Sequence, residues 1–189
     1  TASKRVKFCS QCGSSVALKI PEDDNRERYV CEDCQHVHYQ NPNNVCGAIL
    51  TRGDRVLLCK RAIEPRYGLW TLPAGFMENG ETVAEAACRE AYEEAYAKAH
   101  DVSLFAVFSM PYISQVYLMF AGELTDHQVS AGPESLEVGL YAEHEIPWQQ
   151  LAFPVVGECL KMYFKHGIGK VHHAWFSRDE QYNHRLHLG

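Results

Sequence analysis

The pattern of apolar and polar positions predicts a layered fold of strands and helices. Residues 45–51 and 55–60 are apolar runs that predict two strands, and the Gly53-Asp54 pair between them suits a tight hairpin turn. Further strands are expected over residues 102–109, 113–124 and 137–142.

Two segments have the character of helices. Residues 82–99 contain neither proline nor glycine and are rich in Ala and Glu. Thr82 is suited to the N-cap, and Glu85 three residues later would complete a capping box. A second helix is expected within residues 148–166, with Pro154 breaking or starting it. Strands and helices in this order favour an α/β (α+β) fold.

Composition and charge narrow the function classes. An apolar fraction of 46% in a chain of 189 residues excludes wholesale disorder. No apolar run approaches the ~18 residues of a membrane span, and the first residues lack the apolar core of a signal peptide, so the cytoplasm is the expected location. With 18 Lys and Arg against 24 Asp and Glu, the net charge of −6 argues against nucleic-acid binding by charge alone.

Changes in composition divide the chain into three parts. Residues 1–40 hold two cysteine pairs and a polar loop, and the turn-forming NPNN sequence at 41–44 marks a boundary before the apolar runs. We therefore expect a small module over 1–40, a larger domain over 41–168 and a C-terminal tail over 169–189. The tail holds four of the ten histidines, and their irregular spacing favours a solvated segment over a metal site.

The first four of the eight cysteines have the spacing of a metal site. Two C-x2-C pairs separated by eighteen residues offer two thiolates at each of two turns, as in the tetrahedral four-sulfur sites of Zn²⁺. Such a site has no open position, so the predicted zinc is structural and supplies folding energy to a module too small for a large core. Disulfides or free buried thiols are the alternatives. The predicted ligands are Cys9, Cys12, Cys31 and Cys34.

The predicted helix over residues 82–99 carries an acidic cluster. Glu90, Glu93 and Glu94 are spaced i, i+3 and i+4, which places them on one face within one turn. Like charges at this spacing destabilise an isolated helix, so a compensating positive charge is expected, and divalent cations prefer oxygen ligands. A solvated acidic face is the alternative.

The segment from 75 to 97, GFMENGETVAEAACREAYEEAYA, resembles the Nudix box, G-x5-E-x7-R-E-U-x-E-E-x-G-U, with U an aliphatic residue. The chain departs from this pattern at Tyr96, where the family has glycine, and has alanine at both aliphatic positions, Ala91 and Ala97. A tyrosine there would cost ~1 kcal/mol in a left-handed conformation or let the helix run on. The matching positions are Gly75, Glu81, Arg89, Glu90, Glu93 and Glu94.

The resemblance implies a Nudix-type α/β/α sandwich with a mixed sheet, preceded by a four-cysteine zinc ribbon. Nudix hydrolases cleave a nucleoside diphosphate linked to another moiety, using Mg²⁺ or Mn²⁺. The resemblance implies that Glu90, Glu93, Glu94 and the Gly75 carbonyl bind the catalytic metal, and that Arg89 and Glu81 orient this cluster. In the later GPESLE sequence, Glu137 is expected as an additional ligand or base, with Glu134 as the other candidate.

Motifs outside the box bear on the substrate. KFCSQCG, YQNP, LLCKR, GLWTLPAGF and GPESLE resemble plant FAD and ADP-ribose pyrophosphatases, which implies release of AMP from FAD or ADP-ribose. A zinc ribbon before a Nudix domain is also similar to NADH pyrophosphatases, but FAVFSMPYIS stands where those enzymes have SQPWPFPxS. Tyr67, Phe76 and Tyr112 are expected to stack on adenine or flavin, whereas Trp70 is expected in the core.

Two alternatives to this function stay open. One is a pyrophosphatase for NADH, another dinucleotide or capped RNA. The other is a non-catalytic zinc-ribbon module that binds nucleic acid or protein, although residues 1–44 hold six basic and six acidic residues and thus no excess positive charge. The expected partners are a small-molecule nucleotide diphosphate and, because related enzymes are often homodimers, a second copy of the chain.

Overall fold

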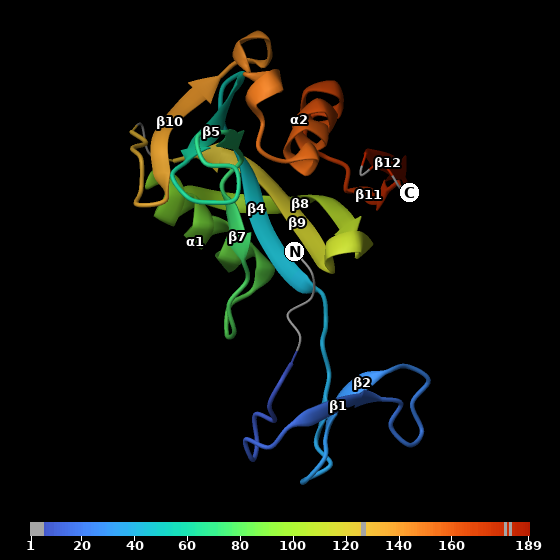
Figure 1. The fold of residues 1–189 in the computed structure, drawn as a ribbon. Helices are drawn as coiled ribbons and strands as arrows, with labels where there is room; N and C mark the ends of the chain where they lie inside the picture. Colours follow the sequence, from blue (N-terminus) through green and yellow to red (C-terminus); the bar gives the residue numbers. More distant parts are fainter. Residues whose placement is uncertain (1–5, 126–127, 180, 182) are drawn as a thin grey trace. The chain divides into compact units, whose positions relative to one another are not determined.

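The computed structural model describes residues 6–125, 128–179, 181 and 183–189. It divides into two compact units, Thr1–Pro42 and Asn43–Gly189 (Figure 1). The first five residues of the expected 1–40 module lie outside the described part. Neither helix in the described ranges has the length and apolarity of a membrane span.

The smaller unit is a three-stranded antiparallel sheet in the order β1-β2-β3. Its strands are β1 (Val16–Lys19), β2 (Arg28–Cys31) and β3 (Val37–His38). Most of its side chains are exposed or half-buried, and its fully buried residues include Cys9, Val30 and Cys31. A core of this size cannot supply much folding energy, so a metal-binding contribution is required.

The larger unit is built on a mixed sheet with the strand order β10-β5-β4-β9-β8-β11-β12, in which β6 pairs with β5 and β7 with β4. The pairs β4–β9 and β8–β11 are parallel, and the other pairs are antiparallel. The strands are β4 (Asn43–Arg52), β5 (Arg55–Arg61), β6 (Trp70–Thr71), β7 (Ala74–Phe76), β8 (Ala99–Met110), β9 (Gln115–Leu124), β10 (Ser135–Tyr141), β11 (His172–Arg178) and β12 (His184–Leu188).

Both faces of the central strands are buried, each under one helix. In β5, Val56 and Leu58 belong to one apolar cluster, and Leu57 and Cys59 belong to the other. The first cluster includes buried side chains of α2 (Pro154–His166), and the second includes four buried alanines of α1 (Val83–Ala95). The continuous apolar runs of β4 and β5 arise because the side chains alternate between these two cores. This arrangement confirms the expected α/β/α sandwich (Figure 1).

The two ends of α1 show how local sequence sets its length. Thr82 caps its first turn by accepting a hydrogen bond from the Glu85 N–H, and the Glu85 carboxylate accepts one from the Thr82 N–H, which confirms the capping box. The helix ends at Ala95, earlier than the expected residue 99, because Tyr96 adopts the left-handed conformation with φ of 46°. The tyrosine thus takes the conformation that glycine favours at a helix end.

The expectation of a solvated tail over residues 169–189 is corrected by the structure. β11 pairs in parallel with β8, and β12 pairs antiparallel with β11, so this segment extends the main sheet. Ala174 and Phe176 are buried, whereas His173 and Trp175, which alternate with them, are exposed. This alternation is the period of a strand with one buried face, and the histidines among the exposed positions hide it in the sequence.

Candidate active site and metal centres

Helix α1 brings together the three predicted carboxylates on the side that faces β7. The Glu94 side chain is almost fully buried, Glu90 is largely buried and Glu93 is half-exposed. The exposed fraction of the three side chains therefore falls from Glu93 through Glu90 to Glu94. Each carboxylate oxygen is a ligand of the type that Mg²⁺ and Mn²⁺ prefer.

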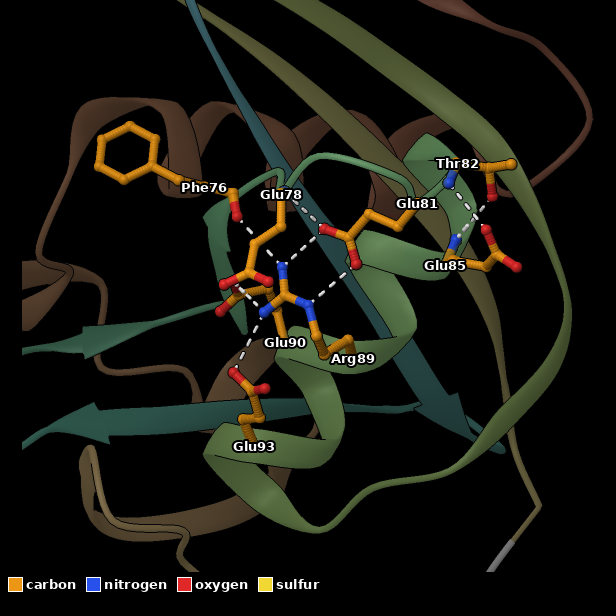
Figure 2. A network of polar contacts seen from close by, with 8 residues as sticks. All are labelled: Phe76, Glu78, Glu81, Thr82, Glu85, Arg89, Glu90 and Glu93. Atoms are coloured by element: carbon orange, nitrogen blue, oxygen red, sulfur yellow. Dashed lines mark hydrogen bonds and ion pairs between the residues drawn. The ribbon is translucent and has the colours of Figure 1, made fainter.

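Arg89 donates hydrogen bonds to four residues around the acids of α1 (Figure 2). Its guanidinium donates to both carboxylate oxygens of Glu81 at 2.9 and 2.8 Å, to Glu90 at 2.8 Å and to Glu93 at 3.1 Å. It also donates to the Phe76 carbonyl at 3.1 Å. These bonds lower the pKa of Glu81 to about 2 and raise the pKa of Arg89 above its ordinary value. The network fixes the loop before α1 to the helix face that carries the acids.

Glu94 lies in the least polar surroundings of the cluster. Burial raises its pKa to about 8, and the backbone N–H of Ala74 lies 3.5 Å from its Oε1 atom. Burial also raises the pKa of Glu90, against the effect of Arg89. Without a cation beside it, Glu94 therefore holds a proton at neutral pH, and a divalent cation bound there would favour the ionised form.

Gly75 lies in β7 and pairs with Cys46 of β4. The carboxyl group of Glu90 lies so close to this position that a Cβ atom on residue 75 would overlap it. The glycine therefore matters through this close approach and not through its backbone conformation, because the φ angle of residue 75 is not left-handed.

The two candidate acids of the GPESLE sequence have different surroundings. Glu137 lies on β10 and pairs with Lys60 at 3.5 Å. Glu134 is close enough to contribute to the raised pKa of both Glu90 and Glu94. Its loop is tied to α1 because Gly132 donates to the Glu94 carbonyl at 2.9 Å, and a side chain at residue 132 would overlap the backbone of Glu93. Both acids belong to the GPESLE sequence, and spacing alone does not separate them.

A pocket lies next to the acids, and most of its polar lining was not predicted. Arg61 at the end of β5 is close enough to Glu94 to lower the pKa of that carboxyl. Its guanidinium carbon lies 5.2 Å from the centroid of the Phe153 ring, and its Nε donates to the Pro65 carbonyl at 2.9 Å. The sequence offered one signal for Arg61, which is a charged residue directly after the apolar run of residues 55–60. The lining residues are Val45, Arg61, Thr71, Leu72, Ala74, Tyr117, Met119, Phe153, Val155 and Val156.

The predicted stacking aromatics are not among the described lining residues of this pocket. Tyr67 and Phe76 are more than half-exposed, and Phe76 lies at the end of β7 beside the Arg89 network. Tyr112 packs against the core near the C-terminal strands. Trp70 is buried as expected, with its ring 5.2 Å from that of Tyr141.

The four predicted zinc ligands converge in the smaller unit. Their Sγ atoms all lie within 4.8 Å of one another, and all eight cysteines are free thiols. Cys12 Sγ lies 3.4 Å from Cys31 and 3.5 Å from Cys34, and Cys9 Sγ lies 3.7 Å from Cys34. Tetrahedral Zn–S bonds of ~2.3 Å would separate the sulfurs by ~3.8 Å, so this donor set fits zinc.

Comparison with known families agrees with the division of the chain into a smaller and a larger unit. Residues 7–40 match the family described as Nudix N-terminal, a zinc ribbon, and residues 41–158 match the NUDIX domain. A NUDIX hydrolase from Nitrosomonas europaea has a crystal structure with a TM-score of 0.86 and 50% identity, covering 90% of this chain and 98% of that one.

Curated relatives share the same region. An NAD-capped RNA hydrolase, NudC, from Stutzerimonas stutzeri is 30% identical over 133 residues, which cover 69% of this chain and 46% of the relative. The protein of the same name from Photobacterium profundum is 25% identical over 72% of this chain and 49% of the relative. The chain thus spans about half the length of these curated relatives. The NUDIX domain of Shewanella oneidensis NrtR, solved with ADP ribose, is 18% identical over 67% of this chain and 90% of that one, with a TM-score of 0.58, and shows the shared fold alone.

Proposed function

Because the chain belongs to the Nudix family, we propose that it is a divalent-cation-dependent pyrophosphohydrolase that cleaves a nucleoside diphosphate linked to another moiety. The observation that carries this proposal is the contact between Glu94 of α1 and Ala74 in the lining of the pocket. Glu94 contacts Ala74, which lines that pocket, and the pocket's Arg61 is close enough to Glu94 to affect its ionisation. A diphosphate that enters the pocket would meet both the cation ligands and a fixed positive charge.

The residues present fit a Mg²⁺ or Mn²⁺ site. Glu90, Glu93 and Glu94 would hold the cation together with the carbonyl of Gly75. The Glu90 carboxyl group fills the space where a Cβ atom on residue 75 would lie. A bound cation would neutralise the diphosphate oxygens and lower the pKa of the attacking water. Arg89 and Glu81 would act as positioning residues, since their bidentate ion pair holds the acids in place. Zinc in the smaller unit would be structural because all four donors are protein thiolates.

The chain's own groups also suggest roles for the proton and the phosphates. We assign Glu134, in place of Glu137, to the additional ligand or general base, because its charge reaches both Glu90 and Glu94. Arg61 would bind a phosphate oxygen, with its guanidinium held by Pro65 and Phe153. Phe153 and Tyr117 offer the aromatic surface for a base that Tyr67 and Phe76 were expected to supply.

FAD and ADP-ribose are the first candidate substrates, with AMP as the product. Two features of the sequence support these substrates. Several motifs are similar to plant FAD and ADP-ribose pyrophosphatases, and the region after the box reads FAVFSMPYIS instead of SQPWPFPxS. A second candidate class is NAD(H) and NAD-capped RNA, which the names of the NudC relatives favour. A homodimer in the cytoplasm remains the proposed assembly and location.

One comparison tests the proposal and ranks these substrates. The full chain with bound zinc is assayed with Mg²⁺ and Mn²⁺ against FAD, ADP-ribose, NADH, diadenosine polyphosphates and nucleoside triphosphates, and kcat/KM is compared. The highest value is expected for FAD or ADP-ribose, and a highest value for NADH would transfer the proposal to the second class. Arg61→Gln should lower kcat/KM about 10- to 100-fold, and Arg26→Gln in the smaller unit should not. No turnover of any diphosphate with either cation would reject the proposal.

A further inference from the structure

The polar side chains among the described lining residues of the pocket differ in whether they already have partners. The Thr71 hydroxyl is occupied, because it donates to the Leu72 carbonyl at 2.9 Å. Arg61 donates from Nε to the Pro65 carbonyl, which leaves the two terminal NH2 groups of its guanidinium. The Tyr117 hydroxyl has no hydrogen bond to any residue that the structure describes. Arg61 and Tyr117 therefore offer donors to a bound molecule.

The side chain of Tyr117 is held by the central strands of the sheet. Tyr117 pairs with Val45 of β4 and with Phe108 of β8, so the three side chains stand on one face. Val45 lines the pocket, and Phe108 is buried in the apolar cluster that includes α2. Tyr117 packs against the same cluster, on the α2 side of the sheet. A side chain supported in this way on a strand suits a residue that positions a ligand.

Arg61 comes to the same pocket from the end of β5. Its guanidinium carbon lies 5.2 Å from the centroid of the Phe153 ring, and Phe153, at the N-cap of α2, is itself a lining residue. The guanidinium is thus held against one wall of the pocket. Burial raises the pKa of Tyr117, whereas the charge of Arg61 lowers it. A hydroxyl beside a fixed positive charge acts more readily as a donor than as an acceptor.

The surroundings of the Tyr117 hydroxyl provide no acceptor for it. The described lining residues other than Arg61, Thr71 and Tyr117 have apolar side chains. Tyr117 is half-buried, so its hydroxyl loses part of its contact with water, and a hydroxyl left without a partner is unfavourable. A bound molecule would supply the acceptor. The group that both a guanidinium and a hydroxyl can bind as donors is an oxygen-rich anion.

We propose that the Tyr117 hydroxyl and the Arg61 guanidinium bind one phosphate group of the substrate together. This inference rests on the proposed function, because it concerns the phosphate that Arg61 would bind. Arg61 supplies the positive charge and a planar pair of donors, and Tyr117 adds a neutral donor from the sheet. The phosphate is thereby held by groups from two different strands. The face of the Tyr117 ring stays available to a base.

Nucleotide binding without turnover tests this contact. The full chain with bound zinc and no added divalent cation is titrated calorimetrically with AMP and with adenosine, at one pH and one ionic strength. The unmodified chain should bind AMP on the order of tenfold more tightly than adenosine. In Tyr117→Phe the affinity for AMP should fall about fivefold and the affinity for adenosine should stay the same, because only AMP carries a phosphate.

Two further variants separate the phosphate contact from packing. Tyr163 packs against the same apolar cluster but is not among the described lining residues, so Tyr163→Phe removes a hydroxyl outside the pocket and should keep both affinities. Arg61→Gln should also weaken AMP binding. The double variant of Arg61 and Tyr117 should lose less AMP affinity than the product of the two single losses, because both side chains bind one group.

Three results would overturn the inference. The first is an unmodified chain that binds AMP no more tightly than adenosine. The second is a Tyr117→Phe variant with unchanged AMP affinity, or with equal losses for AMP and adenosine, which would place the hydroxyl at the nucleoside. The third is a double variant whose loss equals the product of the single losses, which would show that Arg61 and Tyr117 bind different groups.

The two proposals fail in different ways. The titrations need no hydrolysis, so a chain that hydrolyses no diphosphate but loses AMP affinity in Tyr117→Phe would reject the proposed function and keep the phosphate contact. A chain that hydrolyses ADP-ribose but binds AMP equally well with and without the Tyr117 hydroxyl would keep the proposed function and reject the contact.

Discussion

The carboxyl group of Glu90 occupies the space that a side chain on Gly75 would need. The two residues come from different elements, since Gly75 lies in β7 and Glu90 in α1. A glycine at this position therefore allows an acid of the helix to approach the backbone of the neighbouring strand.

Gly75→Ala should reduce activity without unfolding the chain. The group that would be displaced is the end of a flexible side chain, so Glu90 can move away at small cost in stability, but it leaves the cation site. We expect Mg²⁺-dependent turnover to fall about 10- to 100-fold, with Tm lowered by less than ~4 °C. Gly157→Ala is the control, since a Cβ atom there meets Leu151 at an ordinary 3.5 Å. Full activity in Gly75→Ala would contradict the placement of Glu90 at the metal.

Glu94 should make both stability and metal affinity depend on pH. Its pKa in the folded chain is about 8, above the ordinary value of 4.5, so its protonated form is favoured on folding. The contribution is complete below pH 4.5 and is lost as the pH rises through about 8. Denaturant unfolding at a series of pH values, without Mg²⁺, should show this loss in the unmodified chain and not in Glu94→Gln.

Cation binding should follow the same group in the opposite direction. A cation replaces the proton on Glu94, so Mn²⁺ affinity should rise toward pH 8 and binding should release a proton. Calorimetry in buffers of different ionisation enthalpy measures that release. Glu94→Gln should abolish turnover while keeping the fold, because the amide resembles the neutral carboxyl group. Retained turnover, or the same pH slope in both proteins, would show that Glu94 has another role.

Tyr96→Gly should stabilise the larger unit. The left-handed conformation at Tyr96 costs ~1 kcal/mol for a tyrosine and much less for glycine. Tyr92→Gly is the control, because either substitution removes the contact between the two rings, whose centroids are 5.5 Å apart. Tyr92 lies within the helix, so glycine there should destabilise by ~1 kcal/mol. Equal destabilisation of both variants in calorimetric scans would contradict the strain at Tyr96.

Mutation should distinguish the roles of the two acids of the GPESLE sequence, Glu134 and Glu137. Glu134→Gln should lower kcat about 10- to 100-fold, because the Glu134 charge reaches the acids of α1. Glu137→Gln should retain kcat, because that side chain pairs with Lys60 on the edge of the sheet. The pH profile of kcat should change only in the first variant. A larger loss in Glu137→Gln would restore the expectation from the sequence.

Loss of zinc should unfold the smaller unit selectively. Cys12→Ser removes one of the four converging thiols, so the protein should lose its equivalent of zinc and the amides of β1–β3 should exchange rapidly with solvent. Cys88→Ser changes a thiol of α1 outside the cluster and should keep the zinc. Metal analysis with hydrogen exchange measures both effects. Protected amides in zinc-free protein would show that the unit folds without metal.

Local signals explain why much of this molecule could be predicted. The capping box needs only Thr82 and Glu85, and the four-cysteine site needs two short spacings. The pocket could not be found in this way, because Arg61, Tyr117 and Phe153 come from segments far apart in the sequence and meet only in the folded sheet. The strands of the C-terminal segment were missed because its four histidines suggested a polar segment and obscured the two-residue period of β11.

β4 connects the two faces of the sheet through adjacent side chains. Val45 lines the pocket on one face, whereas Cys46 packs in the cluster with the helix that carries the acids. A slip of one residue in the pairing of this strand would exchange the two faces at every position along it. The register of one strand therefore determines which of its side chains line the pocket and which pack beneath α1. Within a fixed register, the pocket side chains on the α2 side can therefore change while the core beneath α1 stays unchanged.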